Sequence, residues 1–547
     1  MLRTGAVGLP VALVAVLIAS CSLTSTPKAT PVTLAADQTL RFPIQHDVAT
    51  LDPAMIDTEA ESEIGHNVFN SLLRYDSNLA IVADVASALP TISADGLTYT
   101  FTLRKDVTFS NGDRVTSKDV LYSWNRAAAM QGPYAGNLSA IAGYEHVANN
   151  QVAGSALEAL LEKRDVSVTL TGVTAQDDYT VVVRLNSPAG WFESAIAQPS
   201  VASSIVDEKV VRGDFVNWWS KPDTLVGTGA FKMAAHAINQ SIDFAAVPGW
   251  WGTSKPTLTA VHVEVLGTGA SALARYESGS YDLFGYGAYT PAASDLVRIQ
   301  QNVAEKSQLV LEVKNKTYFL SFNMVADANR PAGGPFTLDQ GKAAHDLRLA
   351  FNLAIDRIEL AKELCAGVAC IAATGGVIPK GLQGYLGDGA DDLANFDPPR
   401  ARSLLLSADP TGARTNKLVY TYDGENPFND PTAKILQRMW KDNLGVTVDL
   451  RIVPRDRFIT QRLKGGYVLS RDGWTADYDH PQDWFDNLWG SGAGCPDVSC
   501  SSGYVTRAYD QLLAKADGEP ISSALADYKT LSKLLIDDAG YVPLYYT

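Results

Sequence analysis

LTYTFTLRKDVTFSNGDRVTSKDVLYSWNRA, residues 97–127, contains the two local patterns from which the rest of the chain is built. In TYTFTL (98–103) the apolar side chains alternate with threonines, which is typical of a half-buried β-strand. The T-S-K-D sequence at 116–119 has the spacing of a capping box and predicts that a helix begins there. The apolar face of that helix includes Val120 and Trp124.

Both patterns recur on either side of this stretch. VTVDLRI (446–452) alternates like a strand, whereas Ile64, Val68 and Leu72 are spaced as on one face of a helix. A further helix is predicted from about 346 to 364. Strands and helices mixed at this density indicate an α/β or α+β fold class, and we expect α/β.

Length and charge limit the kinds of protein this can be. The 547 residues are too many for one ordinary core, so we expect two or three domains. The net charge of −15, with 45 Lys and Arg against 60 Asp and Glu and no basic block, argues against nucleic-acid binding. No long apolar run follows residue 20, which excludes a polytopic membrane protein.

The first twenty residues have the features of a secretory signal. Arg3 is followed by the apolar run LPVALVAVLIAS at 9–20, and Cys21 comes directly after it. This arrangement resembles a bacterial lipobox, in which cleavage at 1–20 exposes Cys21 for lipidation and acyl chains anchor the protein. Residues 21–36 then form a polar tether. The alternative is an ordinary signal peptide followed by a chance cysteine.

The remaining four cysteines form two local pairs, Cys365 with Cys370 and Cys495 with Cys500, in the sequences CAGVAC and CPDVSC. In an exported protein such pairs predict two short-loop disulfides. The alternative is a zinc site in which the four thiolates converge from separate loops.

The sequence offers no catalytic constellation. It contains no G-x-S-x-G nucleophile elbow, no Walker A sequence, no G-x-G-x-x-G after a strand, and no H-E-x-x-H pair. We interpret His46, His66 and His480 as surface or packing residues. These observations weigh against an enzyme, although a site assembled in space is not visible in sequence.

Nine blocks, in the same order as in one family, are similar to the extracytoplasmic solute-binding proteins of ABC importers, specifically the dipeptide and oligopeptide-binding class. The residues 97–127 form the most specific block. All nine blocks are 49–76, 97–127, 227–233, 248–252, 276–283, 318–324, 346–357, 395–405 and 471–484.

The resemblance implies a two-lobed, periplasmic-binding-protein-like clamp with an additional inserted domain. Lobe I is expected at about 37–71 and 189–318, the inserted domain at 72–188, and lobe II at 319–547. Proteins of this family return to lobe I after a segment like YVPLYY, but this sequence stops at Thr547. We therefore expect the return to lobe I to be missing.

The resemblance also implies a ligand site around 471–477. The aspartate of the family's GW-x-A-D-Y motif, here Asp477, would bind the ligand's α-ammonium group, and Arg471 would approach its carboxylate. Trp474 would form a pocket wall, and Thr475 would present backbone groups. The alternatives are a helix N-cap or loop-stabilising carboxylate for Asp477 and a surface pair with the neighbouring aspartate for Arg471.

Four further residues align with family positions near the ligand. Asp57, Thr58 and Glu59 align with backbone that runs beside the ligand, or else belong to an exposed acidic loop. Tyr134 aligns loosely with a tyrosine near the ligand's first residue, or else packs in the core.

The implied function is the membrane-anchored substrate-binding component of an ABC importer. It would capture short peptides by hinged closure and deliver them to a permease with ATPase subunits, as a monomer without cofactor, metal or nucleic acid. Asp477 and Arg471 together suit a zwitterion, whereas a sugar would need stacked aromatic rings. The alternatives are a non-peptide solute (nickel chelate, haem, opine or oligosaccharide), a secreted hydrolase, and a signalling receptor without an importer.

Overall fold

The computed structural model describes residues 34–150, 152–197, 203–267, 272–285, 289, 291–311, 314–325, 333–493, 495, 500 and 502–547. The chain divides into two units, Met1–Gln38 and Thr39–Thr547, and the sheets of the described residues all lie in the second. The predicted signal peptide and Cys21 lie outside the described residues. Within the described ranges, no helix is long and apolar enough to cross a bilayer.

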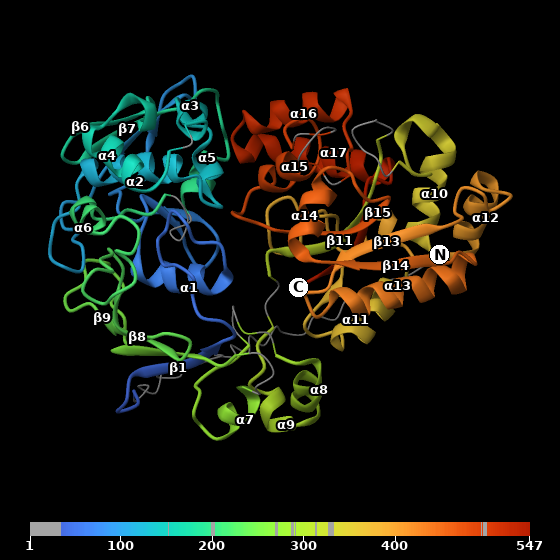
Figure 1. Cartoon of the computed structure of the whole chain (residues 1–547), viewed down its shortest axis with the longest axis horizontal. Helices are drawn as coiled ribbons and strands as arrows, with labels where there is room; N and C mark the ends of the chain where they lie inside the picture. The colour runs from blue at the N-terminus through green and yellow to red at the C-terminus, as the bar shows by residue number, and fades with distance from the viewer. Residues whose placement is uncertain are drawn as a thin grey trace, which may run out of the picture. The chain divides into compact units, whose positions relative to one another are not determined.

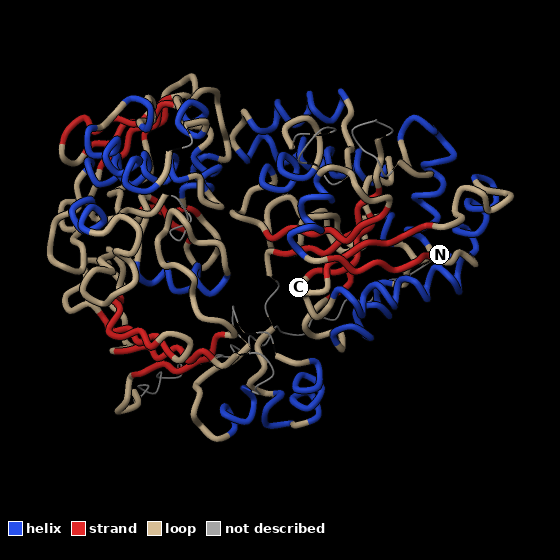
Figure 2. Tube along the Cα trace, viewed as in Figure 1, coloured by secondary structure: helices blue, strands red, loops and turns tan. Residues whose placement is uncertain are grey.

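Three sheets and a short hairpin organise the second unit, and their strands are drawn in red in Figure 2. The first sheet has the order β1-β10-β9-β8, with β1 Thr39–Ile44, β10 Ala260–Val265, β9 Ser241–Ala246 and β8 Phe231–Ala237. The second has the order β4-β5-β7-β6, with β4 Thr91–Ile92, β5 Thr98–Thr102, β7 Thr180–Arg184 and β6 Val173–Asp177. The hairpin joins β2 Leu73–Tyr75 and β3 Ile81–Ala83.

The third sheet carries the candidate site. Its order is β12-β16-β11-β15-β13-β14, with β12 Ile371–Ala372, β16 Val542–Tyr546, β11 Lys316–Phe322, β15 Leu469–Thr475, β13 Leu418–Asp423 and β14 Val448–Val453. β15 is antiparallel to β11 and parallel to β13. Helix α13 (Asn429–Leu444) packs on β13 and β14 and starts next to the end of β13 (Figure 1).

The other helices connect and cover these sheets. They are α1 Glu59–Val68, α2 Ser117–Met130, α3 Tyr144–Ala148, α4 Gly154–Lys163, α5 Phe192–Ile196, α6 Glu208–Gly213, α7 Ala272–Glu277, α8 Ala293–Gln301, α9 Val303–Lys306, α10 Gly341–Leu353, α11 Arg357–Cys365, α12 Pro398–Ala408, α14 Arg455–Leu463, α15 Gln482–Leu488, α16 Arg507–Asp517 and α17 Ile521–Asp537.

The strand and helix predicted in residues 97–127 are confirmed as β5 and α2. The carboxylate of Asp119 accepts a hydrogen bond from the Thr116 backbone N–H at 2.8 Å, so the capping box is formed. Val120 and Trp124 are fully buried, as the apolar spacing predicts.

Two helix predictions were wrong in their extent. The helix through Ile64 ends at Val68, and the chain already enters β2 at Leu73. The helix predicted from 346 to 364 is two helices, α10 and α11. The break arises because the Asp356 carboxylate accepts hydrogen bonds from two backbone N–H groups of the next turn and so caps a new helix.

Apolar side chains form two large cores. One packs the first two sheets together and extends from Ile44 to Val263, and the other surrounds the third sheet from Tyr318 to Tyr545. Tyr478, just after β15, packs in the first core and stacks on Trp191 with ring centroids 6.2 Å apart. The segment after β15 therefore contacts both cores, while the lobe and insert boundaries stay predictions.

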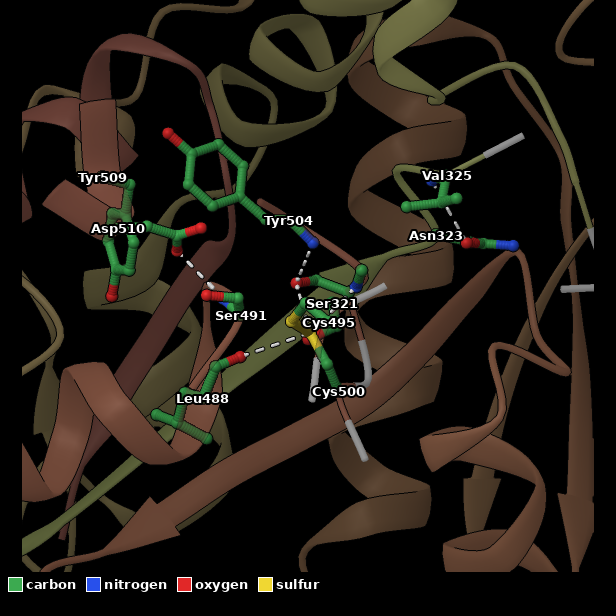
Figure 3. The surroundings of a disulfide bond; sticks show 12 residues. Ser321, Asn323, Val325, Leu488, Ser491, Cys495, Cys500, Tyr504, Tyr509 and Asp510 are labelled. Carbon is green, nitrogen blue, oxygen red and sulfur yellow. Dashed lines mark hydrogen bonds between the residues drawn. A yellow bond between two sulfur atoms is a disulfide. The ribbon is translucent and has the colours of Figure 1, made fainter. Parts of the chain in front are cut away.

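The cysteines pair locally, as predicted. Cys365 is bonded to Cys370 and Cys495 to Cys500, with Cα atoms 5.8 and 5.0 Å apart. Figure 3 shows the second disulfide close to Tyr504 and to the end of α15. The zinc alternative was wrong because all four sulfurs are used in disulfides.

Candidate functional site

One edge of β15 is open. β15 pairs with β11 from Leu469 to Thr475, but it pairs with β13 only at Leu469 and Ser470. In the described part of the chain, the edge from Arg471 to Thr475 that faces β13 therefore has no strand partner. Within this stretch the Gly473 backbone N–H donates to Asp472 Oδ1 at 2.9 Å. A strand edge without a partner strand is where an extended peptide adds to a sheet.

Asp477 lies just beyond this open edge. Its backbone N–H donates to Asp483 Oδ2 at 3.0 Å, and the same oxygen accepts a hydrogen bond from the Trp474 indole N–H at 2.9 Å. Asp483 is fully buried at the start of α15 and thus fixes both Trp474 and Asp477. The Asp477 carboxylate is half-buried and forms no hydrogen bond or ion pair with any described residue.

The surroundings of Asp477 disfavour negative charge. Burial raises the pKa of Asp477 to about 7. Burial, together with the charge of Asp477, raises the pKa of Asp483 well above its usual range. A carboxylate in this position gains by meeting an ammonium group, which supplies the missing counter-charge.

Arg471 faces the opposite end of the open edge. Its Nε donates to Asn429 Oδ1 at 3.1 Å and lies 3.6 Å from Asp423 Oδ2. The guanidinium carbon is 5.7 Å from the centroid of the Tyr318 ring. Its terminal nitrogens, Nη1 and Nη2, donate no hydrogen bond to a described residue, so they are available to an anion.

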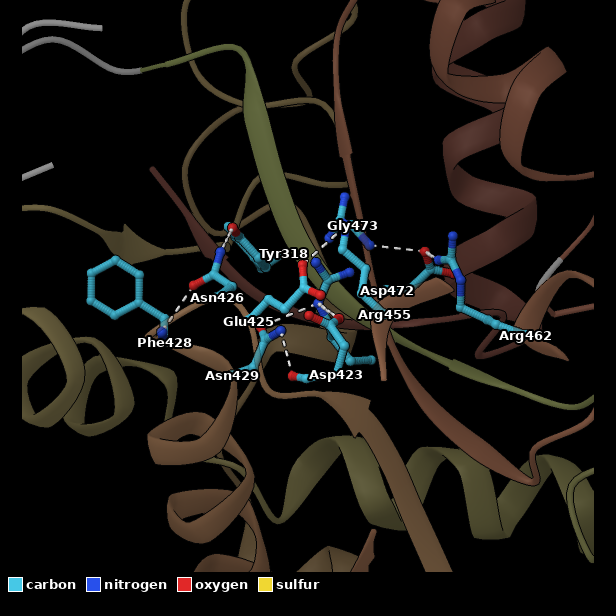
Figure 4. Close-up of polar contacts among 11 residues, drawn as sticks. Tyr318, Asp423, Glu425, Asn426, Phe428, Asn429, Arg455, Arg462, Asp472 and Gly473 are labelled. Atoms are coloured by element: carbon cyan, nitrogen blue, oxygen red, sulfur yellow. Dashed lines mark hydrogen bonds and ion pairs between the residues drawn. The ribbon is translucent and has the colours of Figure 1, made fainter. Parts of the chain in front are cut away.

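The alternative of a surface pair between Arg471 and Asp472 was wrong. Neighbouring side chains on a strand point to opposite faces. Asp472 accordingly accepts hydrogen bonds from Ser321 Oγ and from Arg462 on the other face of β15. Figure 4 shows Asp472 next to Arg462, and Asp423 next to Asn429.

Asp57, Thr58 and Glu59 are all exposed and precede or begin α1. The Thr58 side chain caps α1 in a reciprocal capping box with Glu61, and Glu59 forms an ion pair with Lys314 at 2.6 Å. The backbone N–H groups of Asp57 and Thr58 both donate to Glu61 Oε2. These contacts give the segment a structural role, and its place beside a ligand stays a prediction.

Tyr134 is half-buried and lies outside the large apolar cores. Burial, together with the negative charges of Asp477 and Asp57, raises the pKa of Tyr134 to about 12. The structure thus brings Tyr134 into the electrostatic surroundings of Asp477 and Asp57.

Sequence reasoning missed two residues of this region. Asp483 organises Trp474 and Asp477, and Lys316 lies opposite Thr475 in the pairing of β11 with β15. No motif marks either one. The spacing of six residues between Asp477 and Asp483 was the only signal, and such a spacing has no specific meaning in a loop followed by a helix.

Comparison with known proteins shows the family of the chain. Residues 80–494 match the model of the bacterial extracellular solute-binding proteins, family 5, middle region. The chain belongs to this family. As a family 5 solute-binding protein it is an extracytoplasmic binding protein and not an enzyme, so the hydrolase alternative was wrong.

Relatives of this family 5 protein extend over nearly its full length. It is 26% identical over 520 residues to the periplasmic oligopeptide-binding protein OppA of Escherichia coli, covering 94% of this chain and 88% of OppA. It is 27% identical over 561 residues to the periplasmic murein peptide-binding protein MppA of Escherichia coli, covering 97% of this chain and 92% of MppA.

Solved structures agree on the fold. The unliganded open form of MppA superposes with a TM-score of 0.74 at 24% identity, covering 94% of this chain and 92% of that one. Haemophilus influenzae OppA in complex with RPPGFSPFR gives 0.68 at 22% identity, covering 94% of each chain. The predicted α/β, two-lobed periplasmic-binding-protein fold is therefore confirmed.

Proposed function

We propose that this family 5 protein is the membrane-anchored substrate-binding component of an ABC importer and that it captures short peptides. The observation that carries the proposal is the half-buried Asp477 carboxylate, which has no partner among the described residues and lies at the end of the open edge of β15. Such an arrangement suits a ligand that has an extended backbone and an ammonium group at one end.

Each end of the ligand has a counterpart on β15 or directly after it. Asp477 receives the α-ammonium group, and the free terminal nitrogens of Arg471 lie toward the carboxyl end. The exposed Thr475 presents backbone groups, and Trp474, whose N–H is held by Asp483, forms a wall. Asp57, Thr58, Glu59 and Tyr134 lie beside the amino end in this proposal.

The names of several relatives support a peptide over the non-peptide solutes. Besides OppA and MppA, they include a dipeptide-binding protein of Lactococcus lactis, 26% identical over 497 residues. Helicobacter pylori DppA, solved in complex with the peptide STSA, superposes with a TM-score of 0.67.

Capture in this proposal is a hinged closure. A ligand shifts the equilibrium between open and closed forms only by its differential affinity for them. Contacts with lobe I and lobe II supply that difference, and the closed form docks on a permease whose ATPase subunits drive transport. In this proposal the protein acts as a monomer without cofactor or metal, and capture and release break no covalent bond.

The proposed function is tested by mass spectrometry of the small molecules that natively purified protein releases on denaturation. The expected result is a mixture of short peptides with free amino ends. A single non-peptide species would overturn peptide capture. It would leave the fold and the family unchanged.

The membrane anchor belongs to the same proposal and rests on Cys21 following the apolar run at 9–20. Acylation contributes about 0.8 kcal/mol per buried CH₂, so two or three chains hold the protein on the membrane. Cys21→Ser is expected to move the protein from the membrane fraction to the soluble fraction on cell fractionation. A variant that stays with the membrane would refute the anchor.

A further inference from the structure

Two cations share the surroundings of one aromatic ring on the third sheet. The Nζ atom of Lys316 lies 5.0 Å from the centroid of the Tyr318 ring, and the guanidinium carbon of Arg471 lies 5.7 Å from the same centroid. Tyr545 stacks on Tyr318 with centroids 4.8 Å apart and an interplanar angle of 25°, so it covers one face of the ring. The two cations can therefore contact the Tyr318 ring only on its other face and at its edges.

The strand register explains why these side chains meet. Lys316 is opposite Thr475, Tyr318 is opposite Gly473, and Arg471 belongs to the same alternate set on β15, so all of them lie on one face of the sheet. Gly473 has no side chain, and a Cβ atom there would lie only 2.9 Å from the backbone oxygen of Thr317. Because residue 473 has no side chain, the space beside Tyr318 stays open, and the two cations lie at its border.

The charges around this ring do not balance. Arg471 is already matched by the buried Asp423, at 3.6 Å. Arg462 is matched by Asp472, and Arg455 by Glu425 at 3.8 Å. Lys316 forms no ion pair with any carboxylate in the part of the chain that is described.

We propose that Lys316 and the terminal nitrogens of Arg471 together bind the carboxylate of the ligand beside Tyr318, and that Lys316 provides the net positive charge that makes this possible. This inference rests on the proposed peptide function. Without Lys316, Arg471 and Asp423 cancel and the subsite is neutral. With it, one ligand carboxylate balances the site, which favours a free, singly charged carboxyl end.

The register also limits the length of the ligand. Tyr318 and Lys316 lie at the level of Gly473 and Thr475, which are four and two residues before Asp477. At about 3.3 Å per residue this separation is roughly 7–13 Å, the span of an extended peptide of about two to four residues. A tripeptide is therefore the appropriate probe.

The test is a calorimetric cycle with trialanine and its carboxyl-terminal amide, measured on ligand-free wild-type protein and on Lys316→Met. Amidation is expected to weaken wild-type binding about tenfold, because a neutral amide no longer balances Lys316. Lys316→Met is expected to weaken binding of the free acid about tenfold and to remove most of the penalty for amidation. Lys316→Arg should restore both.

The matched control is Lys533→Met, which removes one positive charge from the exposed face of α17 and should behave as wild type. An amidation penalty that is equal in wild type and Lys316→Met, or absent in wild type, would overturn the role of Lys316 and leave peptide capture intact. If the wild type binds neither peptide, the proposed function fails together with this inference.

Discussion

Asp477→Asn is expected to weaken binding of a short peptide by about 100- to 1,000-fold in calorimetric titration. Removing one partner of a desolvated ion pair costs on the order of 3–5 kcal/mol, because the ligand's ammonium group would remain buried without a counter-charge. Asn has nearly the shape of Asp, and the backbone N–H of residue 477 still donates to Asp483. The loss is therefore one of charge rather than of fold.

Although Asp477→Asn weakens peptide binding, it is not expected to lower the free energy of unfolding of the ligand-free protein at high pH. Burial raises the pKa of Asp477 to about 7, so the folded protein holds this proton more tightly than the unfolded chain, whose Asp titrates near 3.9. The contribution of Asp477 to the free energy of unfolding is thus present at low pH and is lost as pH rises from about 4 to about 7. Asn does not titrate.

Ligand-free Asp477→Asn should accordingly be at least as stable as wild type at pH 8, which urea unfolding at pH 5 and pH 8 would measure. Peptide affinity of the wild type should also fall below about pH 7, because the ammonium group must displace the Asp477 proton. A variant equally destabilised at both pH values would indicate a structural carboxylate instead.

The second large effect concerns Asp52, whose carboxylate is buried against Arg126. The guanidinium of Arg126 donates to both oxygens of Asp52, one at 2.8 Å, and the Trp218 indole N–H donates to the same carboxylate at 3.3 Å. Arg126 is 1% exposed and Asp52 is 3% exposed. Asp52→Asn leaves Arg126 buried without a counter-charge and is expected to lower the free energy of unfolding by about 3–5 kcal/mol.

The matched control is Asp178→Asn. It breaks the exposed ion pair of Asp178 with Lys118 at 3.7 Å and should cost less than about 1 kcal/mol. Both variants are compared with wild type by urea unfolding of the ligand-free protein. A cost for Asp52→Asn as small as that of Asp178→Asn would show that the buried pair contributes nothing specific.

Local patterns in the sequence predicted local structure well. The capping box at Thr116 and Asp119 and the alternation in β5 are complete within a few residues, so nothing distant is needed to recognise them. The break between α10 and α11 was missed because apolar spacing continues across it while the Asp356 cap interrupts the backbone.

The candidate site is less predictable because it is assembled from distant segments. Asp477 and Arg471 were found only through the family's motif. Lys316 and Arg471 lie near the same Tyr318 ring because β11 pairs with β15, and those strands are about 150 residues apart in the sequence. Spacing along the chain carries no information about such a pairing, and the same holds for the place of Asn429 beside Arg471.

The central claim is that Asp477 receives the ammonium group of the ligand, and its most direct test is titration with trialanine and with N-acetyl-trialanine. Wild type is expected to lose about 100-fold or more in affinity on acetylation, while Asp477→Asn binds both peptides equally weakly. Equal affinity of wild type for the two peptides, or the same acetylation penalty in wild type and variant, would contradict the claim.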